Sequence, residues 1–288
     1  MVTTKHSTVS YRRPNKIYGP QESAMFETRE RVHIEDGPKR VRTYLGGELI
    51  ADTKRLKLVW EVPYYPAYYF PREDVHMELL TPNGHTRRSP SRGDAHNFTV
   101  KGGNREVEDA AWYYPESPVE ELRNLIRFEW NAMERWFEED EEVFVHPHDP
   151  YTRIDILHSS RHVEVEVNGV TIADTHRPTL LFETRLPTRY YIPKLDVRMD
   201  LLIPTDTVTG CAYKGFAEYW SVNAGGETVK DLAWSYKMPF PENVKIAGLV
   251  AFYNERADFI VDGDARRDQR PSSREPGYGQ ACGIGACW

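Results

Sequence analysis

The chain has 288 residues, of which 40% are hydrophobic and 28% are charged, and its formal net charge is −7. This composition is ordinary for a soluble globular protein, and the length fits two domains of about 100–150 residues each. Because phosphate binding needs a basic surface, the acidic balance argues against nucleic acid and an anionic membrane as partners.

The sequence also lacks signals for export and for metal binding. No apolar run approaches the roughly 18 residues that span a bilayer, and Met1–Arg13 has no apolar segment typical of a signal peptide. We therefore expect a cytoplasmic protein. The three cysteines do not suggest a disulfide framework, and without a Cys-x-x-Cys pair or a zinc-spaced histidine cluster we predict no metal site and no cofactor.

Short apolar runs and turn residues predict a first β domain at residues 38–140, preceded by a polar N-terminal arm at residues 1–37. Gly46–Gly47 joins two apolar runs in a manner typical of a hairpin. Asp74–Leu80 alternates with period two, so we expect a strand there. Ser117, with the proline that follows it, predicts a short helical turn.

A connector is predicted at residues 141–158, beginning in an acidic run that is most simply a solvated surface. His146 and His148 stand two residues apart beside Asp149 and could ligate a metal. A pair of histidines without a third ligand is weak support for this, because loop histidines usually cap and hydrogen-bond.

A second β domain is predicted at residues 159–263. Its first hairpin turns at Asn168–Gly169, a pair that tolerates positive φ at both turn positions. Asp196–Leu202 again alternates with period two and predicts a strand. The remaining residues, 264–288, are rich in Arg, Pro, Ser and Gly and predict a disordered tail that contains Cys282 and Cys287.

The two domains are copies of one unit. Shifting Val163–Tyr236 back by 122 residues lays it on Val41–Tyr114 without a gap, and 27 of the 74 positions are identical. Such self-similarity marks a duplicated module. With short strands and frequent turn residues in both copies, the expected fold class is mostly β, in a tandem duplication of one small domain.

Several motifs resemble those of the family catalogued as domain of unknown function 427. They are A-D-[ST]-x-R, L-x-F/W-E, Y-Y-x-P-x-x-D-V, C-x-Y-K-G-x-A-x-Y-W-S-V and A-W-S-Y, and the connector E-E-V-F-V-H-P-H-D-P-Y is similar to that of two-copy members. The resemblance covers roughly Pro38 to Gly263. It implies a β-tent-like fold, in which two small sheets meet at an angle over a cleft. Relatives of that fold often hold zinc through two Cys-x-x-Cys knuckles, which this chain lacks, so no metal site is carried over.

Polar and aromatic side chains recur at matching positions and are candidates for a small-molecule site. Lys214, Glu183 and Asp196 of the second copy are the predicted acid–base residues, beside a cation and an aromatic wall that would hold the ligand. We expect all of them to meet in a hollow between two sheets. The predicted ligand-binding residues are Arg177, Tyr190, Tyr191, Tyr213 and Trp234, with Arg55, Glu61, Tyr68, Tyr69 and Arg92 in the first copy.

A structural interpretation of the same residues stands beside the functional one. Paralogous copies share whatever their fold requires, so Arg177 can pair with Asp196 or Glu183 purely as scaffold. Trp234 is also typical of the core anchor of a small β domain.

Cys211 is the candidate nucleophile, because Lys214 lies three residues further on and a nearby cation lowers the pKa of a thiol. Its own module segment offers no histidine as a base, however, and the first copy has Ser89 at this position. The first copy also has Arg92 in place of Lys214, so chemistry that needs an amine would be confined to the second copy.

The family also carries a nucleotidyltransferase label, which these residues do not support. Such chemistry needs two carboxylates close enough to share a divalent metal. Asp196 and Asp200, four residues apart on an expected strand, would lie about 13 Å apart. The sequence also has no Gly-rich loop with phosphate-binding spacing.

The favoured hypothesis is a metal-independent small-molecule enzyme that works by acid–base catalysis in the cleft of the second copy. The alternatives are a ligand-binding or sensing module without turnover, and a structural or interaction protein.

Overall fold

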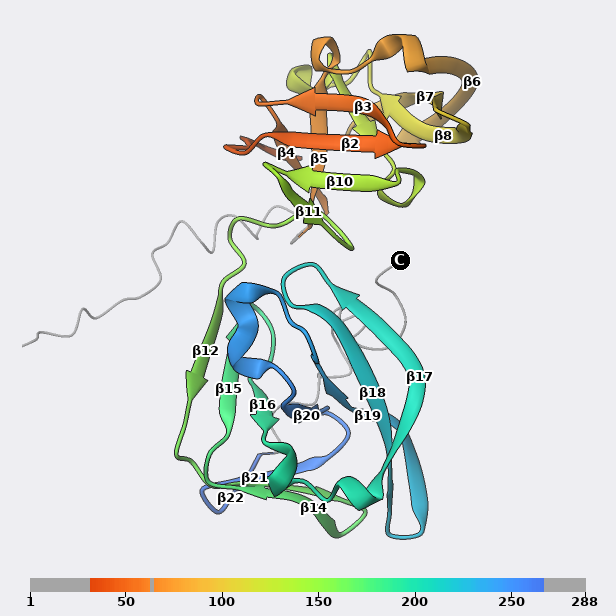
Figure 1. The fold of residues 1–288 in the computed structure, drawn as a ribbon. Coiled ribbons are helices and arrows are strands. Elements are labelled where there is room, and N and C mark those ends of the chain that lie inside the picture. Colours follow the sequence, from red (N-terminus) through yellow and green to blue (C-terminus); the bar gives the residue numbers. More distant parts are fainter. Residues whose placement is uncertain (1–31, 63–64, 267–288) are drawn as a thin grey trace, which may run out of the picture.

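The computed structural model describes residues 32–62 and 65–266 (Figure 1). Most of the predicted arm and tail, including Cys282 and Cys287, lies outside the described residues. Within them the chain forms two halves, and each half contains one seven-stranded and one four-stranded antiparallel sheet. No helix of the described part is long and apolar enough to cross a membrane.

In the first half the strands form two sheets, in the orders β1-β4-β5-β9-β8-β7-β6 and β11-β10-β2-β3. Four short 3-10 turns lie between strands. The strands are β1 (His33–Asp36), β2 (Val41–Leu45), β3 (Glu48–Thr53), β4 (Lys57–Val62), β5 (Tyr65–Pro71), β6 (Leu80–Ser89), β7 (Gly93–Gly102), β8 (Arg105–Tyr113), β9 (Leu125–Phe128), β10 (Arg135–Glu138) and β11 (Glu141–Val143), and the turns are η1 (Arg72–Asp74), η2 (Met77–Leu79), η3 (Glu120–Leu122) and η4 (Trp130–Ala132).

The second half repeats this topology strand for strand, in the orders β12-β15-β16-β20-β19-β18-β17 and β14-β13-β21-β22. The mostly β fold class and the tandem duplication are confirmed. The strands are β12 (Ile154–His158), β13 (Val163–Val167), β14 (Val170–Thr175), β15 (Thr179–Glu183), β16 (Arg189–Ile192), β17 (Leu202–Cys211), β18 (Gly215–Ala224), β19 (Glu227–Ser235), β20 (Val250–Phe252), β21 (Asp258–Val261) and β22 (Asp264–Arg266), and the turns are η5 (Lys194–Asp196), η6 (Met199–Leu201) and η7 (Pro241–Ile246).

An apolar core fills the space between the two sheets of each half, and the first half has a second buried cluster that includes Val59, Tyr69 and Trp112. In β13, Val163, Val165 and Val167 are at most 3% exposed, while the glutamates between them are half-buried on the opposite face. This alternation follows from the two-residue period of a strand. The core therefore occupies the inter-sheet space that the sequence analysis assigned to the site.

The strands predicted at Asp74–Leu80 and Asp196–Leu202 are wrong. Each stretch starts at the last residue of one 3-10 turn and contains a second 3-10 turn, and β6 or β17 begins only at its last leucine. The backbone of this stretch makes isolated hydrogen bonds in place of a continuous strand ladder. Val75 makes one isolated bridge to Ala51, and His76 N donates to Ile50 O at 2.9 Å. Period-two apolar spacing alone does not distinguish this arrangement from a strand.

In the first half, the tip of the β2–β3 hairpin contacts the tip of the β7–β8 hairpin through backbone atoms. Gly46 has a φ of +57°, and a Cβ placed there would lie 2.1 Å from the carbonyl oxygen of Gly102. Gly47 has a φ of +75° with open space around it. In the second half the corresponding turn uses Asn168, whose Nδ2 donates to Ala224 O at 3.2 Å. The turn is conserved in shape between the copies although its packing differs.

The Gly46→Ala substitution is expected to destabilise the protein more than Gly47→Ala. Both variants incur about 1–2 kcal/mol for a side chain in the left-handed region. Gly46→Ala adds about 1–3 kcal/mol for the overlap with the Gly102 carbonyl. Chemical denaturation of the two variants measures the difference, and equal losses would contradict the close approach of the tips.

Candidate functional site

Two predicted site residues in strand β16 lie on opposite faces of the seven-stranded sheet. Tyr190 and Tyr191 are successive, so their side chains point to opposite faces. Tyr190 packs on Phe259 of the four-stranded sheet, with ring centroids 5.4 Å apart. Tyr191 lies on the face turned away from that sheet. The predicted hollow between the sheets is therefore not where these residues meet; those that gather do so on the outer face of the larger sheet.

The centre of this outer face is a buried ion pair. Lys214 lies in the turn between β17 and β18, and its Nζ donates to Oε2 of Glu183, at the end of β15, at 2.6 Å. The two side chains are 9% and 8% exposed. Burial lowers the pKa of Lys214, but the acidic neighbours Cys211, Glu183 and Tyr191 together raise it above its ordinary value. Lys214 is thus a cation at neutral pH and not a free amine.

Two aromatic side chains adjoin the ion pair. Trp234 Nε1 donates to the hydroxyl of Tyr191 at 3.3 Å. Burial raises the pKa of Tyr191 to about 12, although Lys214 and the Trp234 hydrogen bond act in the opposite direction. Tyr191 is therefore a neutral phenol at physiological pH, able to donate a proton in a hydrogen bond.

A second cation covers Trp234 on the same face. The guanidinium of Arg189 lies 5.5 Å from the centroid of Trp234 and 5.6 Å from that of Tyr253. Arg189 is held in place by Glu255, with N–O distances of 2.8 and 2.9 Å. This cation and Tyr253 were missed by sequence reasoning, because neither recurs in the first copy.

Cys211 ends β17, opposite Gly215, and is partly buried. Burial raises the pKa of Tyr236, and the nearby Cys211 raises it further, as it also does for Tyr191 and Lys214. Tyr236 was not singled out from the sequence, although it closes the repeated A-W-x-Y motif and so carried a signal. Glu183, Lys214, Tyr191, Cys211 and Tyr236 form what we call the outer-face cluster.

The connector packs against the end of the hairpin formed by β17 and β18. The ring of Phe144 lies 5.8 Å from that of Phe216 and 6.0 Å from that of Phe240. Val145 adopts a φ of +73°, and a Cβ on Gly210 would lie 2.7 Å from its Cγ2. Positive φ is a genuine outlier for a β-branched residue. The strain falls where the connector presses against the end of β17.

His146 supplies the histidine that the second copy's own segment lacks. Its ring lies between Tyr65 and Tyr213, with centroid distances of 5.4 and 5.9 Å. Burial lowers the pKa of His146, and the charges of Lys214 and Glu183 also act on it. His146 is therefore a neutral imidazole at physiological pH beside the outer-face cluster. Sequence reasoning missed this role because the residue lies in the connector.

His148 joins the two halves and does not share a metal with His146. Its Nδ1 donates to Oε2 of Glu138 at 3.0 Å, and its Nε2 donates to Ala212 O at 2.9 Å. Burial by itself would lower the pKa of His148, but these two hydrogen bonds outweigh burial and raise the pKa above its ordinary value. His146 Nδ1 instead lies 2.7 Å from Pro147 O. The metal pair considered from the sequence does not form.

Tyr68 and Tyr213, two predicted ligand-binding residues, serve this junction. Tyr68 is 3% exposed, and its hydroxyl donates to Glu138. The Tyr213 hydroxyl accepts the backbone N–H of Asp149 at 2.8 Å. Both hydroxyls are thus occupied by connector contacts.

Arg177 and Asp196 form a separate surface ion pair. Arg177 donates from Nε and Nη2 to the Asp196 carboxylate, both at 2.9 Å, and its side chain is 62% exposed. Hydrogen bonding to Arg177 lowers the pKa of Asp196. The first copy repeats the pair as Arg55 and Asp74, at 2.8 Å. These residues lie outside the outer-face cluster, which favours the scaffold interpretation.

In the equivalent cluster of the first half, the carboxylate of Glu61 has several partners. Glu61 accepts hydrogen bonds from Tyr69 and Arg127, and Arg92 Nη2 lies 3.5 Å from its carboxylate. The strand pairing places Ala251 where the first half has Arg127. Among the described residues, Glu183 therefore has a single lysine donor where Glu61 has three neighbours.

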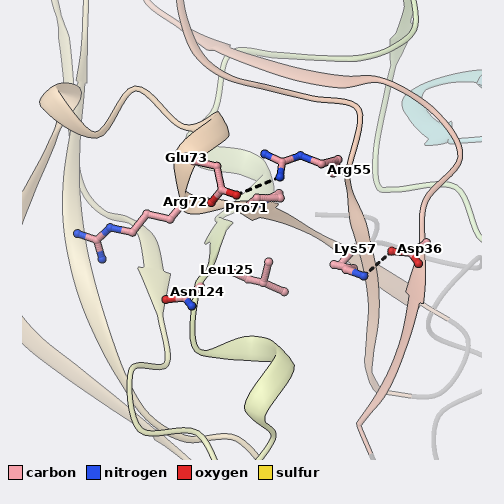
Figure 2. Close-up of a pocket in the computed structure, with 8 residues that line it drawn as sticks. All are labelled: Asp36, Arg55, Lys57, Pro71, Arg72, Glu73, Asn124 and Leu125. Atoms are coloured by element: carbon pink, nitrogen blue, oxygen red, sulfur yellow. Dashed lines mark hydrogen bonds and ion pairs between the residues drawn. The ribbon is translucent and has the colours of Figure 1, made fainter.

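An open groove of ≈ 690 Å³ lies in the first half, where β4, β5 and η1 meet (Figure 2). Arg55 pairs with Glu73 at 3.0 Å, and Lys57 pairs with Asp36. The cations that line the groove are thus largely neutralised within it. The predicted aromatic-lined cleft belongs to the second half, so this groove does not correspond to it.

Asp196 and Asp200 do not form a metal site of the nucleotidyltransferase kind. They lie in the successive turns η5 and η6, and not on one strand as expected. Asp196 is paired with Arg177, and Asp200 with Arg198 at 2.7 Å. Each carboxylate already has its own guanidinium partner.

A family model described as a domain of unknown function (DUF427) matches the chain twice, over residues 33–139 and 155–263. The two matches coincide with the two structural halves. No curated protein matches the chain.

Proposed function

Since the chain belongs to the DUF427 family as a two-copy member, we propose that its second copy is the working one, a metal-independent enzyme acting on a small organic molecule. The substrate is held and converted at the outer-face cluster. The observation that carries this proposal is the Lys214–Glu183 pair, which lies at 2.6 Å with little exposure. A buried cation and a carboxylate beside a thiol and two phenols form a concentrated set of groups able to bind and move protons.

The chemistry follows from exchange of partners within the pair. A carboxylate or carbonyl oxygen of the substrate replaces Glu183 as the hydrogen-bond acceptor of Lys214. Lys214 then stabilises negative charge on that oxygen, which is the role of a preorganised cation. Glu183, relieved of its cation, accepts a proton from the substrate as the general base. Tyr191 is placed to donate a hydrogen bond to the same oxygen.

The first copy supports the assignment by contrast. Glu61 is held by a phenol and a guanidinium and faces a second guanidinium. Displacing all of these neighbours at once would leave several buried charges unpaired, which is strongly unfavourable. We infer that the first copy is a scaffold for the second.

A substrate screen with paired variants tests this function. The full chain is incubated with a panel of small carboxylic acids, aldehydes and ketones, and products are followed by mass spectrometry. Glu183→Gln is expected to lower turnover about 10²–10⁴-fold, the usual contribution of a general base. The matched first-copy variant, Glu61→Gln, is expected to leave turnover unchanged, with folding of both checked by circular dichroism.

Three results would contradict the enzyme proposal. Turnover that survives Glu183→Gln would remove the general base, and equal loss in Glu61→Gln would remove the difference between copies. Binding without conversion would identify a ligand-binding or sensing module.

A further inference from the structure

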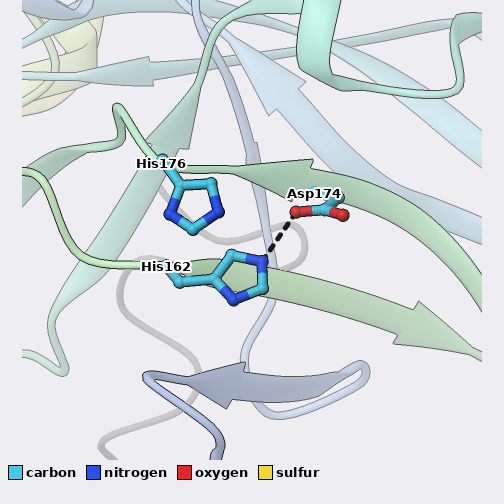
Figure 3. A group of neighbouring side chains, drawn as sticks. All are labelled: His162, Asp174 and His176. Atoms are coloured by element: carbon cyan, nitrogen blue, oxygen red, sulfur yellow. Dashed lines mark hydrogen bonds and ion pairs between the residues drawn. The ribbon is translucent and has the colours of Figure 1, made fainter.

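Three metal-ligating side chains meet on the four-stranded sheet of the second half (Figure 3). His162 immediately precedes β13, Asp174 lies in β14, and His176 directly follows β14. One ligand atom from each lies within 4.8 Å of the other two. This sheet is not the one that carries the outer-face cluster, so the inference is independent of the proposed function.

The register of the two strands places these residues on one face. Glu164 pairs with Asp174 and Val163 with Thr175, so continuing the antiparallel pairing sets His162 opposite His176. Residues two apart on a strand share a face. The valines of β13 point into the core, so the three ligands stand on the solvent side of the sheet. Glu164 shares that side, with a carboxylate oxygen 3.7 Å from His162 Nδ1.

The side chains are already in mutual contact. The rings of His162 and His176 stack with centroids 4.1 Å apart and planes 11° apart, and His162 Nε2 lies 2.8 Å from Asp174 Oδ1. The backbone of His162 is fixed from the other side, since its N–H donates to Asp262 Oδ1 at 3.0 Å and its carbonyl accepts Asp262 N at 2.9 Å. The loop that carries the first ligand is therefore anchored.

The first copy has the same carboxylate with different neighbours. The shift of 122 residues sets Arg40 at the place of His162, Asp52 at that of Asp174 and Lys54 at that of His176. Arg40 Nε donates to Asp52 Oδ1 at 2.7 Å, so a fixed cation neutralises the carboxylate. Protonated guanidinium and ammonium groups have no lone pair for a metal, whereas a neutral imidazole does. The second copy thus has a histidine, which can bind a metal, at each of the two positions where the first copy has a cation.

We propose that His162, Asp174 and His176 form a binding site for a divalent transition metal, with Zn²⁺ as the best-fitting ion. Two imidazoles and one carboxylate match the donor set of three-ligand zinc sites, in which water or a further ligand takes the fourth position. Zinc bonds of about 2.0–2.1 Å bring the donor atoms closer than 4.8 Å. Asp174 and His176 are exposed, so rotation of side chains achieves this without repacking the core.

Metal titration of the full chain tests the site. Protein freed of metal with a chelator is titrated with ZnCl₂ by calorimetry, and separately with CoCl₂, whose visible absorption reports tetrahedral nitrogen and oxygen coordination. One equivalent of each metal is expected to bind. His162→Arg with His176→Lys, which installs the first copy's residues, is expected to weaken that binding at least 100-fold. Asp174→Asn alone is expected to weaken it at least 10-fold.

Control variants separate this site from other ligands in the chain. His76→Ala removes an exposed histidine that pairs with Glu78 at 3.0 Å and is expected to leave the affinity unchanged. Cys282→Ser with Cys287→Ser is expected to do the same. If the double histidine variant, folded by circular dichroism, still takes up one equivalent, or if the cysteine variant loses it, the site is overturned. The absence of any bound equivalent in the wild-type chain overturns it as well.

Discussion

Replacing Lys214 with methionine is expected to lower the free energy of unfolding by about 3–5 kcal/mol, the loss found when one partner of a buried ion pair is removed. The Glu183 carboxylate, whose side chain is 8% exposed, would remain in place with its charge unpaired. Methionine fills most of the lysine volume, so the loss reports charge and not a cavity. Urea denaturation at pH 7, followed by tryptophan fluorescence, measures it.

Two comparisons sharpen this expectation. Lys57→Met removes the cation of a pair whose Asp36 partner is 82% exposed, and it is expected to cost less than about 1 kcal/mol. Combining Lys214→Met with Glu183→Leu removes both charges and is expected to recover most of the stability, because an apolar replacement of a buried pair is often neutral. If Lys214→Met alone lowered the free energy of unfolding as little as Lys57→Met, the description of Lys214 and Glu183 as a buried ion pair would be contradicted.

Glu138→Gln is expected to lower the stability at pH 7 by about 3 kcal/mol, the linkage value of a carboxyl pKa that falls from 4.5 to about 2 on folding. Burial by itself would raise the pKa of Glu138, but hydrogen bonds from His148, Lys39 and Tyr68 outweigh it. The side chain is 11% exposed, so solvent screening is weak. The glutamine variant keeps the shape of the side chain and loses the charge.

The pH dependence of this loss has a defined sign. Because the pKa is lower in the folded protein, the stabilisation is fully present above pH 4.5 and disappears as the pH falls through about 2. Denaturation curves at pH 7, 4 and 2 should therefore show the wild type converging on the variant. Glu142→Gln, which breaks the exposed pair with Arg135 at 2.8 Å, serves as control and should cost less than about 1 kcal/mol. A constant difference across this range would refute the assignment.

The mostly β fold class and the duplication followed from regular patterns in the sequence. The turn pairs at Gly46–Gly47 and Asn168–Gly169 and the alternation of Val163 to Val167 each act over a few residues, and the duplication is visible as an unbroken shift of 122 residues. Two strand predictions were wrong because a period-two pattern is also compatible with consecutive 3-10 turns. The likeness of each half to the β-tent architecture stays a prediction.

The candidate site was harder to predict from the sequence. The sheet face on which a side chain lies, and the residue with which it pairs, depend on strand pairing between distant parts of the chain. Tyr190 and Tyr191 are adjacent in sequence and look equivalent, yet one lies in the core and the other in the outer-face cluster. Arg177 recurs in both copies because it holds Asp196 in place. His146 could be assigned to the second copy only after the path of the connector was known. The group formed by His162, Asp174 and His176 was not found from the sequence, because strand pairing brings His162 close to the other two residues.

The connector joins the two copies through side-chain contacts with both of them. Phe144, Val145 and His146 precede the second copy in the chain but pack against it, while Glu138 and His148 link the end of the first copy to Ala212. A gene that kept only residues 155–263 would encode a protein whose β17–β18 hairpin had lost these contacts. Removing the first copy together with the connector would therefore expose the surface of the second copy that these residues contact.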